Sequence, residues 1–222
     1  MDIFNNYLNW ILSVVITVAA ALISITFHEV SHGFAAYKMG DDTAKIYGRL
    51  SLNPFKHLDI IGTICLVLFR FGWAKPVPVN QYNFKDRKKG IILVSLAGPF
   101  SNLLLAFVAQ FCMTLIEKFG GISDLDWCLY YFFRALTVTN LGLCVFNLIP
   151  IPPLDGSRVL GEFLSEGQRY RFESISKYSS FILLALLWLP RISTLFSSLL
   201  NVVVSAIYTG YQTVINLILG VL

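Results

Sequence analysis

Three ionisable residues lie close together in an otherwise apolar stretch of the chain, within the sequence FHEVSHG: His28, Glu29 and His32. On a helix, His28 and His32 are one turn apart on the same face, which is the spacing that two nitrogen ligands of one Zn²⁺ require. Glu29 is next to His28, where its carboxylate can reach a water on the ion without being a ligand. Ionisable groups in apolar surroundings are costly and mark a candidate functional site.

The spacing of these residues is HExxH, which occurs in zinc proteases. A structural interpretation is also open, because two histidines can be satisfied by hydrogen bonds within the helix while Glu29 extends to the membrane interface. The chain has only 3 histidines among its 222 residues, so a chance match is rare. We therefore favour a zinc site over the structural interpretation.

A catalytic zinc site uses three protein ligands and a water, so one ligand is still to be found. His57, the remaining histidine, lies in NPFKHLDIIGT, and Asp155 lies in NLIPIPPLDGSRVL after an apolar run. Three prolines before Asp155 break the helix and allow an extended segment to bring its carboxylate toward the first apolar run. Alone, Asp155 is more simply an Asp-Gly turn. Beside HExxH, we prefer it as the third ligand.

The elements that position these residues follow from composition. The chain is 56% hydrophobic and 14% charged, whereas soluble domains average about 45–50% apolar and about 25% charged residues. Four runs have no charged residue, and each is long enough to cross a bilayer as a helix, which takes about 20 residues: 3–27, 91–116, 135–154 and 192–222. This composition excludes a soluble enzyme, a disulfide-rich secreted fold and a disordered chain. We predict an all-α polytopic membrane protein with a single membrane-embedded domain over residues 1–222.

We expect about five transmembrane helices, of which the fourth is short for a span: 7–36, 91–116, 131–150, 176–190 and 195–219. The catalytic core then covers about 7–165, and the C-terminal helices cover about 176–219.

A small β or re-entrant element is predicted between the first two spans. Ala44–Leu52 alternates well enough for a strand, and Thr63–Trp73 is apolar but too short to span. Pro76 and Pro78 fix an extended segment. Irregular backbone near a membrane requires protein or a water-filled cavity to satisfy its polar groups, so we expect this element to fold against the helices.

The basic residues are unevenly distributed. Ten Lys and Arg lie in 37–90 and four in 151–178, against one in 117–130 and none in 1–6. Basic loops stay in the cytoplasm. We therefore expect a multi-pass protein of the cell membrane with its N-terminus outside and its active site near the cytoplasmic side. The net charge of +4 is explained by this orientation, and no nucleic-acid partner is expected.

Taken together, HExxH in a span and N-x-x-P-x-P-P-L-D-G over 147–156 resemble the site-2 protease family of intramembrane zinc metalloproteases, peptidase family M50. Residues 53–63, 73–80 and 97–103 also look like segments of its short members, which lack PDZ and CBS domains. The resemblance covers about residues 22–165.

The resemblance implies that His28, His32 and Asp155 bind one Zn²⁺ per chain and that Glu29 is the general base. It also implies that Asn147 lies near the ion, where its amide orients the substrate or stabilises the oxyanion. The implied activity is regulated intramembrane proteolysis of transmembrane-helix substrates in the lipid bilayer, with a regulatory partner that the sequence does not name. For His57 we expect a structural or gating hydrogen bond in preference to metal ligation.

A helical substrate hides its peptide bonds, so it must unwind locally before attack. We expect an edge of 44–52 or 73–80 to pair with the opened strand. Two other classes of function are considered. A metal or ion transporter also places ionisable residues in spans, but no inverted repeat is visible in the sequence. A catalytically inactive membrane-binding protein could keep the fold, although every residue of the metal set is present.

Overall fold

The computed structural model describes residues 2–59, 61–62, 64–65, 74–121 and 123–220. Its α-helices are α1 (Asp2–Met39), α2 (Thr43–Ile46), α4 (Arg87–Phe119), α5 (Asp124–Asn147), α6 (Asp155–Gly161), α7 (Glu166–Trp188) and α8 (Pro190–Ile218). Two short 3-10 helices are η1 (Pro54–Lys56) and η2 (Gln81–Asn83). Among the described residues the β pairing is limited to one antiparallel bridge, between Leu58 and Ala74.

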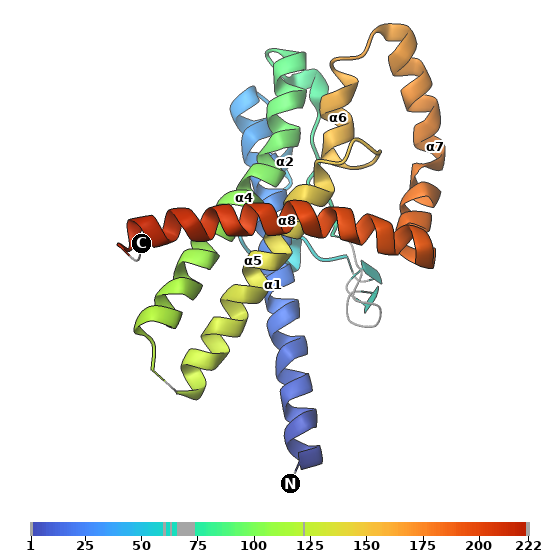
Figure 1. Ribbon diagram of the computed structural model, residues 1–222. Helices are drawn as coiled ribbons and strands as arrows, with labels where there is room; N and C mark the ends of the chain where they lie inside the picture. Colours follow the sequence, from blue (N-terminus) through green and yellow to red (C-terminus); the bar gives the residue numbers. More distant parts are fainter. Residues whose placement is uncertain (1, 60, 63, 66–73, 122, 221–222) are drawn as a thin grey trace.

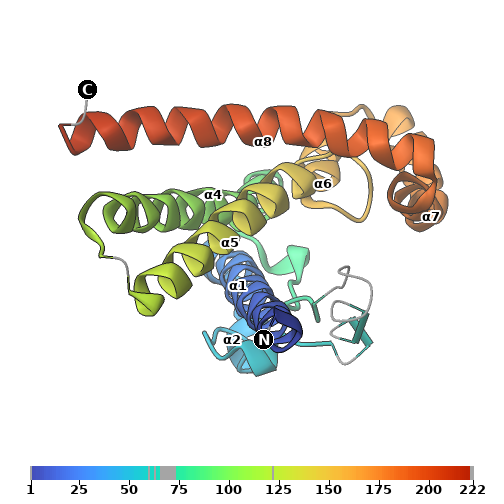
Figure 2. The same ribbon diagram turned by 60° about the horizontal axis from the view of Figure 1, so that its bottom comes forward.

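Helices α1, α4 and α5 pack against one another and form the centre of the molecule (Figures 1 and 2). One buried cluster joins Ala20 of α1, Ala109 of α4 and Leu136 of α5. Small residues at such contacts let helix backbones approach closely in a membrane, where packing replaces the hydrophobic effect as the main attraction. A second cluster joins Ala36 near the end of α1 to Val94 near the start of α4.

Among the described residues, four helices are long and apolar enough to cross a membrane: Trp10–Met39 of α1, α4, α5 and Phe196–Ile218 of α8. This result agrees with an all-α, multi-pass membrane protein. The fourth expected span, 176–190, lies mostly in α7, which starts at Glu166 with a polar half and is not among the four. The expected count of five spans is therefore not reproduced among the described residues.

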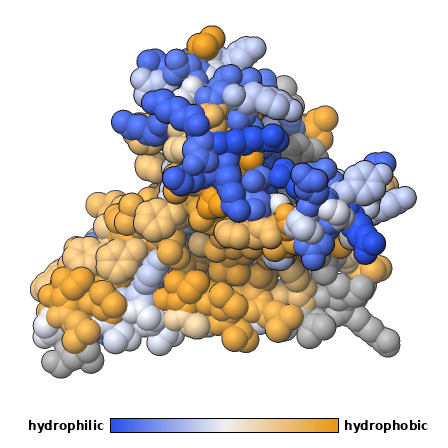
Figure 3. All heavy atoms as spheres, turned by 90° about the horizontal axis from the view of Figure 1, so that it is seen from above, coloured by the Kyte–Doolittle hydropathy of each residue, from blue (hydrophilic) through white to orange (hydrophobic). Residues whose placement is uncertain are grey.

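Parts of the two basic loops lie at the same end of the molecule. In Figure 1 the N-terminus and the α4–α5 turn are at one end, while α2, which belongs to 37–90, and α6, which belongs to 151–178, are at the other. Figure 3 shows polar residues gathered on one part of the surface and apolar residues over most of the remainder. In Figure 1 helix α8 crosses in front of α4 and α5, and it contacts both helices.

The strand expected at 44–52 is wrong. Residues Thr43–Ile46 form α2, and the chain then turns at Gly48, whose φ is +63°. The Ile46 amide donates to the Asp42 carbonyl at 2.9 Å. A short helical turn satisfies its own backbone groups, whereas a lone strand leaves them without partners.

The remainder of the predicted β element is also reduced. Residues 74–80 form an extended segment outside any strand. Of the apolar stretch 63–73, only residues 64–65 lie among the described residues. The described part of the connection is thus mostly irregular chain that packs against α1 and α4.

Candidate metal centre

His28 and His32 point their Nε2 atoms at one location beside α1. The two Nε2 atoms are 3.0 Å apart, and each is 3.2 Å from Oδ2 of Asp155. Among the described residues these three make up the one group of histidine, cysteine or acidic side chains whose ligand atoms are close enough to hold a metal ion. The structure thus brings the two histidines of HExxH together with the expected third ligand.

Asp155 reaches the histidines because α6 starts immediately beside the end of α5. The segment 148–154 consists of turns and bends, and Asp155 is the first residue of α6. A Cβ at Gly156 would lie 2.2 Å from the carbonyl oxygen of Leu148. Only glycine allows this close approach, so Gly156 lets the start of α6 pack against the end of α5 and places the Asp155 carboxylate.

The space for the histidine rings is provided by α4. A Cβ at Gly98 would lie 2.4 Å from Nε2 of His32 and 2.6 Å from Cε1 of His28. Any side chain there would overlap the rings. Gly98 therefore forms the wall of the site that faces α1.

Each histidine ring is oriented through its other nitrogen. Nδ1 of His28 lies 2.6 Å from Oδ1 of Asn102, and Nδ1 of His32 lies 2.7 Å from the carbonyl oxygen of Val94. A carbonyl oxygen only accepts hydrogen bonds, so Nδ1 of His32 carries the proton and its Nε2 presents a lone pair. Such outer partners are typical of metal-binding histidines.

The electrostatics of the group favour a cation. Asp155 is buried, and its Oδ2 has no hydrogen-bond partner within the described part of the chain. A tetrahedral zinc with bonds of about 2.0–2.1 Å separates its ligand atoms by about 3.3 Å. The measured separations of 3.0 and 3.2 Å fit such an ion.

Glu29 is half-buried and lies next to the metal group in sequence. Its Oε2 accepts a hydrogen bond from the backbone N–H of Val77 at 2.8 Å. The extended segment 74–80 is held further by Arg49, whose Nη2 donates to the carbonyl oxygen of Lys75 at 2.6 Å. The carboxylate expected to act as a base is thus tied to the loop that follows α2.

Asn147 and His57 lie outside the metal group. Asn147 ends α5, and its Nδ2 donates to the Leu143 carbonyl at 3.0 Å. The structure therefore leaves its expected role untested. His57 is 1% exposed, and its Nε2 is 2.8 Å from the Ser51 carbonyl. That contact is a structural hydrogen bond of the kind expected for this residue.

Sequence reasoning missed two polar residues that support the site, Asn102 and Asn140, and a third buried polar residue, Asp41, in the loop after α1. All three have a relative exposure of 0%. Asn102 and Asn140 stand within long apolar runs, which is a signal that marks them for attention. Asp41 gives no such signal, because it lies in a polar loop sequence.

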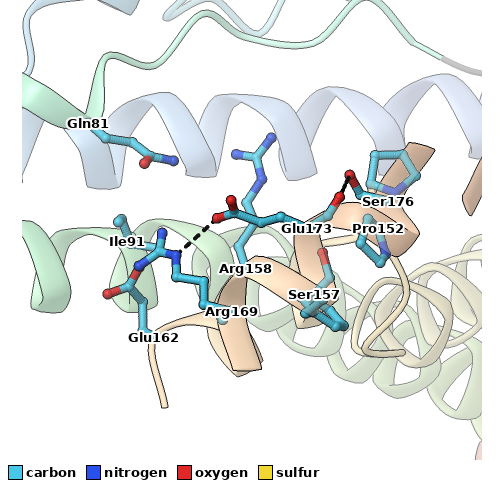
Figure 4. A pocket seen from close by; sticks show the side chains of 12 residues that line it. Gln81, Ile91, Pro152, Ser157, Arg158, Glu162, Arg169, Glu173 and Ser176 are labelled. Carbon is cyan, nitrogen blue, oxygen red and sulfur yellow. Dashed lines mark hydrogen bonds and ion pairs between the residues drawn. The ribbon is translucent and has the colours of Figure 1, made fainter. Parts of the chain in front are cut away.

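A separate cavity of about 220 Å³ lies between α6, α7 and the start of α4 (Figure 4). On one wall, Arg169 forms ion pairs with Glu162 at 3.2 Å and with Glu173 at 3.0 Å. None of the three metal-facing residues lines it. We assign no step of the chemistry to this cavity.

Comparisons with known proteins place this geometry in a family. Residues 115–190 match the sequence profile of peptidase family M50. YwhC of Bacillus subtilis, which is named as a candidate zinc metalloprotease, is 42% identical over 186 residues, covering 83% of this chain and 85% of YwhC. The chain belongs to peptidase family M50. Membership confirms the sequence-based expectation of a zinc metallopeptidase, and the metal group described above is where the residues can hold the ion.

Other relatives extend the comparison beyond one organism. Rip2 of Mycolicibacterium smegmatis, also named as a candidate zinc metalloprotease, is 31% identical over 192 residues. The matched region covers 83% of this chain and 71% of Rip2. MJ0611 of Methanocaldococcus jannaschii, named in the same way, is 35% identical over 68% of this chain and 71% of its own. No solved structure matches the chain.

Proposed function

We propose that this M50 family member is an intramembrane zinc metalloprotease that cleaves peptide bonds within or near the transmembrane helices of membrane proteins, in regulated intramembrane proteolysis. The observation that carries the proposal is the position of the metal group. His28 and His32 belong to a helix long and apolar enough to span a membrane, and Asp155 meets them from α6.

His28, His32 and Asp155 are the proposed ligands of one zinc per chain. When bound, zinc supplies a water acidified to a pKa of about 7 and a Lewis acid for the substrate carbonyl. His28 and His32 belong to α1 and Asp155 belongs to α6, and both helices pack against α4. This packing keeps the three donor atoms close together before the ion binds.

Glu29 is the proposed general base. It accepts a proton from the attacking water and later passes it to the leaving amine. The Val77 amide, which donates to Oε2 of Glu29, limits the directions in which the carboxylate can turn. Asn147 is proposed to hold the substrate backbone or the developing oxyanion, for which its amide must leave the Leu143 carbonyl.

Residues 74–80 are the proposed docking edge for the substrate. Residues 75–80 lie outside any helix or strand, and Pro76 and Pro78 lack a backbone N–H, so a substrate strand would pair through the remaining backbone groups. A substrate strand that pairs with this segment would be held in an unwound form. It would lie close to Glu29, because Val77 of the segment donates a hydrogen bond to Glu29. The segment 44–52 is no longer a candidate, because it forms a helix and a turn.

We further propose that residues 1–222 form a single catalytic domain in the cell membrane, with a core at about 7–165. Helix α2 in 37–90 and helix α6 in 151–178 share the end opposite the N-terminus, which supports a cytoplasmic active site and an external N-terminus.

The proposal is tested by Glu29→Gln in the full chain, reconstituted in vesicles with a membrane-spanning reporter peptide. We expect wild type to cleave the reporter within its apolar segment, and Glu29→Gln to bind zinc normally while cleavage falls by about 10²–10⁴-fold. Glu166→Gln, at an exposed position on α7, is the matched control and is expected to cleave like wild type.

Equal cleavage by Glu29→Gln and wild type would overturn the assignment of the base. Zinc accumulating inside vesicles without cleavage would identify a transporter instead. Zinc binding with neither cleavage nor transport would identify an inactive binding protein.

A further inference from the structure

Three fully buried polar side chains lie behind His28, where the membrane-spanning helices meet. They are Ser24 of α1, Asn102 of α4 and Asn140 of α5, each 0% exposed. Polar groups in this position are costly unless each one finds a partner. Their hydrogen bonds form one connected network across the three helices, which ends on the ring of His28.

The hydrogen atoms of the first part of the network have only one consistent arrangement. The hydroxyl of Ser24 donates to the Ala20 carbonyl at 2.7 Å, and Nδ2 of Asn140 donates to the Leu136 carbonyl at 2.8 Å. Both carbonyls are acceptors only. Nδ2 of Asn140 therefore also donates to the Ser24 hydroxyl oxygen, at 2.7 Å, and Oδ1 of Asn140 is left as the acceptor that faces Asn102.

The second part follows from the first. Nδ2 of Asn102 donates to Oδ1 of Asn140 at 2.6 Å and to the Ser24 backbone carbonyl at 3.2 Å. Oδ1 of Asn102 must then face His28, whose Nδ1 lies 2.6 Å away. Because that oxygen only accepts, Nδ1 of His28 carries the proton, and its Nε2 is left with a lone pair directed at the metal group.

We infer that Asn102, held by Asn140 and Ser24, is a positioning residue that fixes the tautomer and the ring orientation of His28 for metal binding. The inference rests on the metal site of the proposed function. The two histidines differ in the partner of their Nδ1 atoms. The backbone carbonyl of Val94 orients His32, whereas the side-chain amide of Asn102 orients His28. Only the support of His28 can therefore be removed by substitution.

Zinc affinity of the detergent-purified full chain tests the inference, measured by competition with a chromophoric chelator. Asn102→Leu is expected to bind zinc about 10–100-fold more weakly than wild type, which is the usual effect of losing an outer partner of a ligand. Gln110→Leu is the matched control. Gln110 is also a fully buried amide of α4, eight residues further along, but it donates to Tyr208 and Gln212 of α8. Its zinc affinity is expected to equal that of wild type.

A second variant distinguishes the acceptor oxygen of the Asn102 amide from its donor nitrogen. It also serves as the test if Asn102→Leu fails to fold. Asn102→Asp keeps an oxygen facing Nδ1 of His28 but loses the bonds donated to Ser24 and Asn140. We expect its zinc affinity to stay within a few fold of wild type. Zinc binding weakened 10-fold or more in Asn102→Asp would show that the acceptor oxygen is not what matters and would overturn the inference.

The tautomer itself is read from ¹⁵N-imidazole NMR of the zinc-free protein. Wild type is expected to show His28 protonated at Nδ1, and Asn102→Leu is expected to lose that preference. Unchanged zinc affinity in Asn102→Leu, or an equal loss in Gln110→Leu, would overturn the inference. If wild type takes up no zinc at all, the proposed function fails, and the NMR result still decides whether Asn102 sets the tautomer.

Discussion

Two buried aspartates, Asp41 just after α1 and Asp155 at the start of α6, are surrounded in opposite ways. Asp41, 0% exposed, accepts hydrogen bonds from the backbone amides of Thr43 and Asn80 and from the side chains of Thr43 and Asn83. Asp155, 9% exposed, has an oxygen with no hydrogen-bond donor among the described residues. One carboxylate is enclosed by donors, and the other faces two ring nitrogens.

This contrast separates a structural carboxylate from a ligand. An ionised carboxylate out of water requires compensation, which either N–H and O–H donors or a cation can supply. Asp41 is compensated by its own loop, so it joins the end of α1 to residues 80–83 without any ion. Asp155 lacks such donors, and the neighbouring nitrogens also present lone pairs, so a cation is the missing partner.

The largest expected effect is the loss of zinc from Asp155→Asn. An amide is a poorer ligand than a carboxylate and cannot balance the charge of the ion, so we expect zinc affinity to fall by more than about 100-fold, beyond the effect of losing an outer partner. Thermal unfolding with and without added zinc measures it, because a ligand that binds the folded state raises the Tm. Wild type is expected to show this rise, and Asp155→Asn is not.

A full zinc-dependent rise in Tm for Asp155→Asn would contradict the assignment of the third ligand. In that case His57 becomes the next residue to replace, although its Nε2 is already bonded to Ser51.

A smaller effect on zinc binding is expected from adding a methyl group to α4 at Gly98, beside the two histidine rings. In Gly98→Ala the new methyl group lies within 2.4–2.6 Å of the rings of His28 and His32, which must shift. We expect zinc to bind about 10–100-fold more weakly, as for other changes that misplace a ligand. Gly142→Ala is the control, because a Cβ there meets nothing within 4 Å. Chelator competition compares the two, and equal affinities would show that the ring positions are not restricted by α4.

Much of the membrane architecture could be predicted from the sequence, because long uncharged runs carry it. The expected span 91–116 falls inside α4, and 195–219 falls inside α8 except for its last residue. Helix ends were less predictable, since they depend on local caps. Helix α5 starts at Asp124, seven residues before the expected position, because Ser123 and Asp126 form a capping box. The strand at 44–52 failed because alternation over so few residues cannot supply a pairing partner.

The site was predictable where function fixes residue spacing along the chain. HExxH and the Asp-Gly motif predict the three residues that the structure brings together: His28, His32 and Asp155. The support of the site was not predictable, because it depends on contacts between distant residues. Asn102 meets His28 across 74 positions, and Asn80 meets Asp41 across 39 positions. Only polar residues inside apolar runs gave a hint of the first contact.

The enclosed carboxylate gives the converse of the Asp155 result. In Asp41→Asn an NH₂ group replaces one carboxylate oxygen and points at N–H and O–H donors, so hydrogen bonds are lost. We expect the free energy of unfolding to fall by about 1.5–3 kcal/mol, as for other hydrogen bonds to charged groups. The zinc-dependent rise in Tm is expected to remain. Asp42→Asn is the control, because the Asp42 side chain is exposed and makes no capping hydrogen bond to α2. Loss of the zinc response in Asp41→Asn would remove the distinction between the two carboxylates.

The smallest expected effect is a pH dependence of the difference in free energy of unfolding between wild type and Asp41→Asn. Burial raises the pKa of the Asp41 carboxyl, but hydrogen bonds from Thr43, Asn80 and Asn83 lower it by more, so the folded-state pKa lies below its ordinary value. The stabilisation by the charged form is therefore complete above the unfolded-state pKa of about 3.9 and is lost as the pH falls through the folded-state pKa. Asp41→Asn has no such titration. The difference in free energy of unfolding between wild type and Asp41→Asn is thus expected to be constant from about pH 5 to 7 and to shrink below about pH 4. A difference that grew in acid would mean that Asp41 is stabilised in its protonated form, and the loop would then be held by a neutral carboxyl.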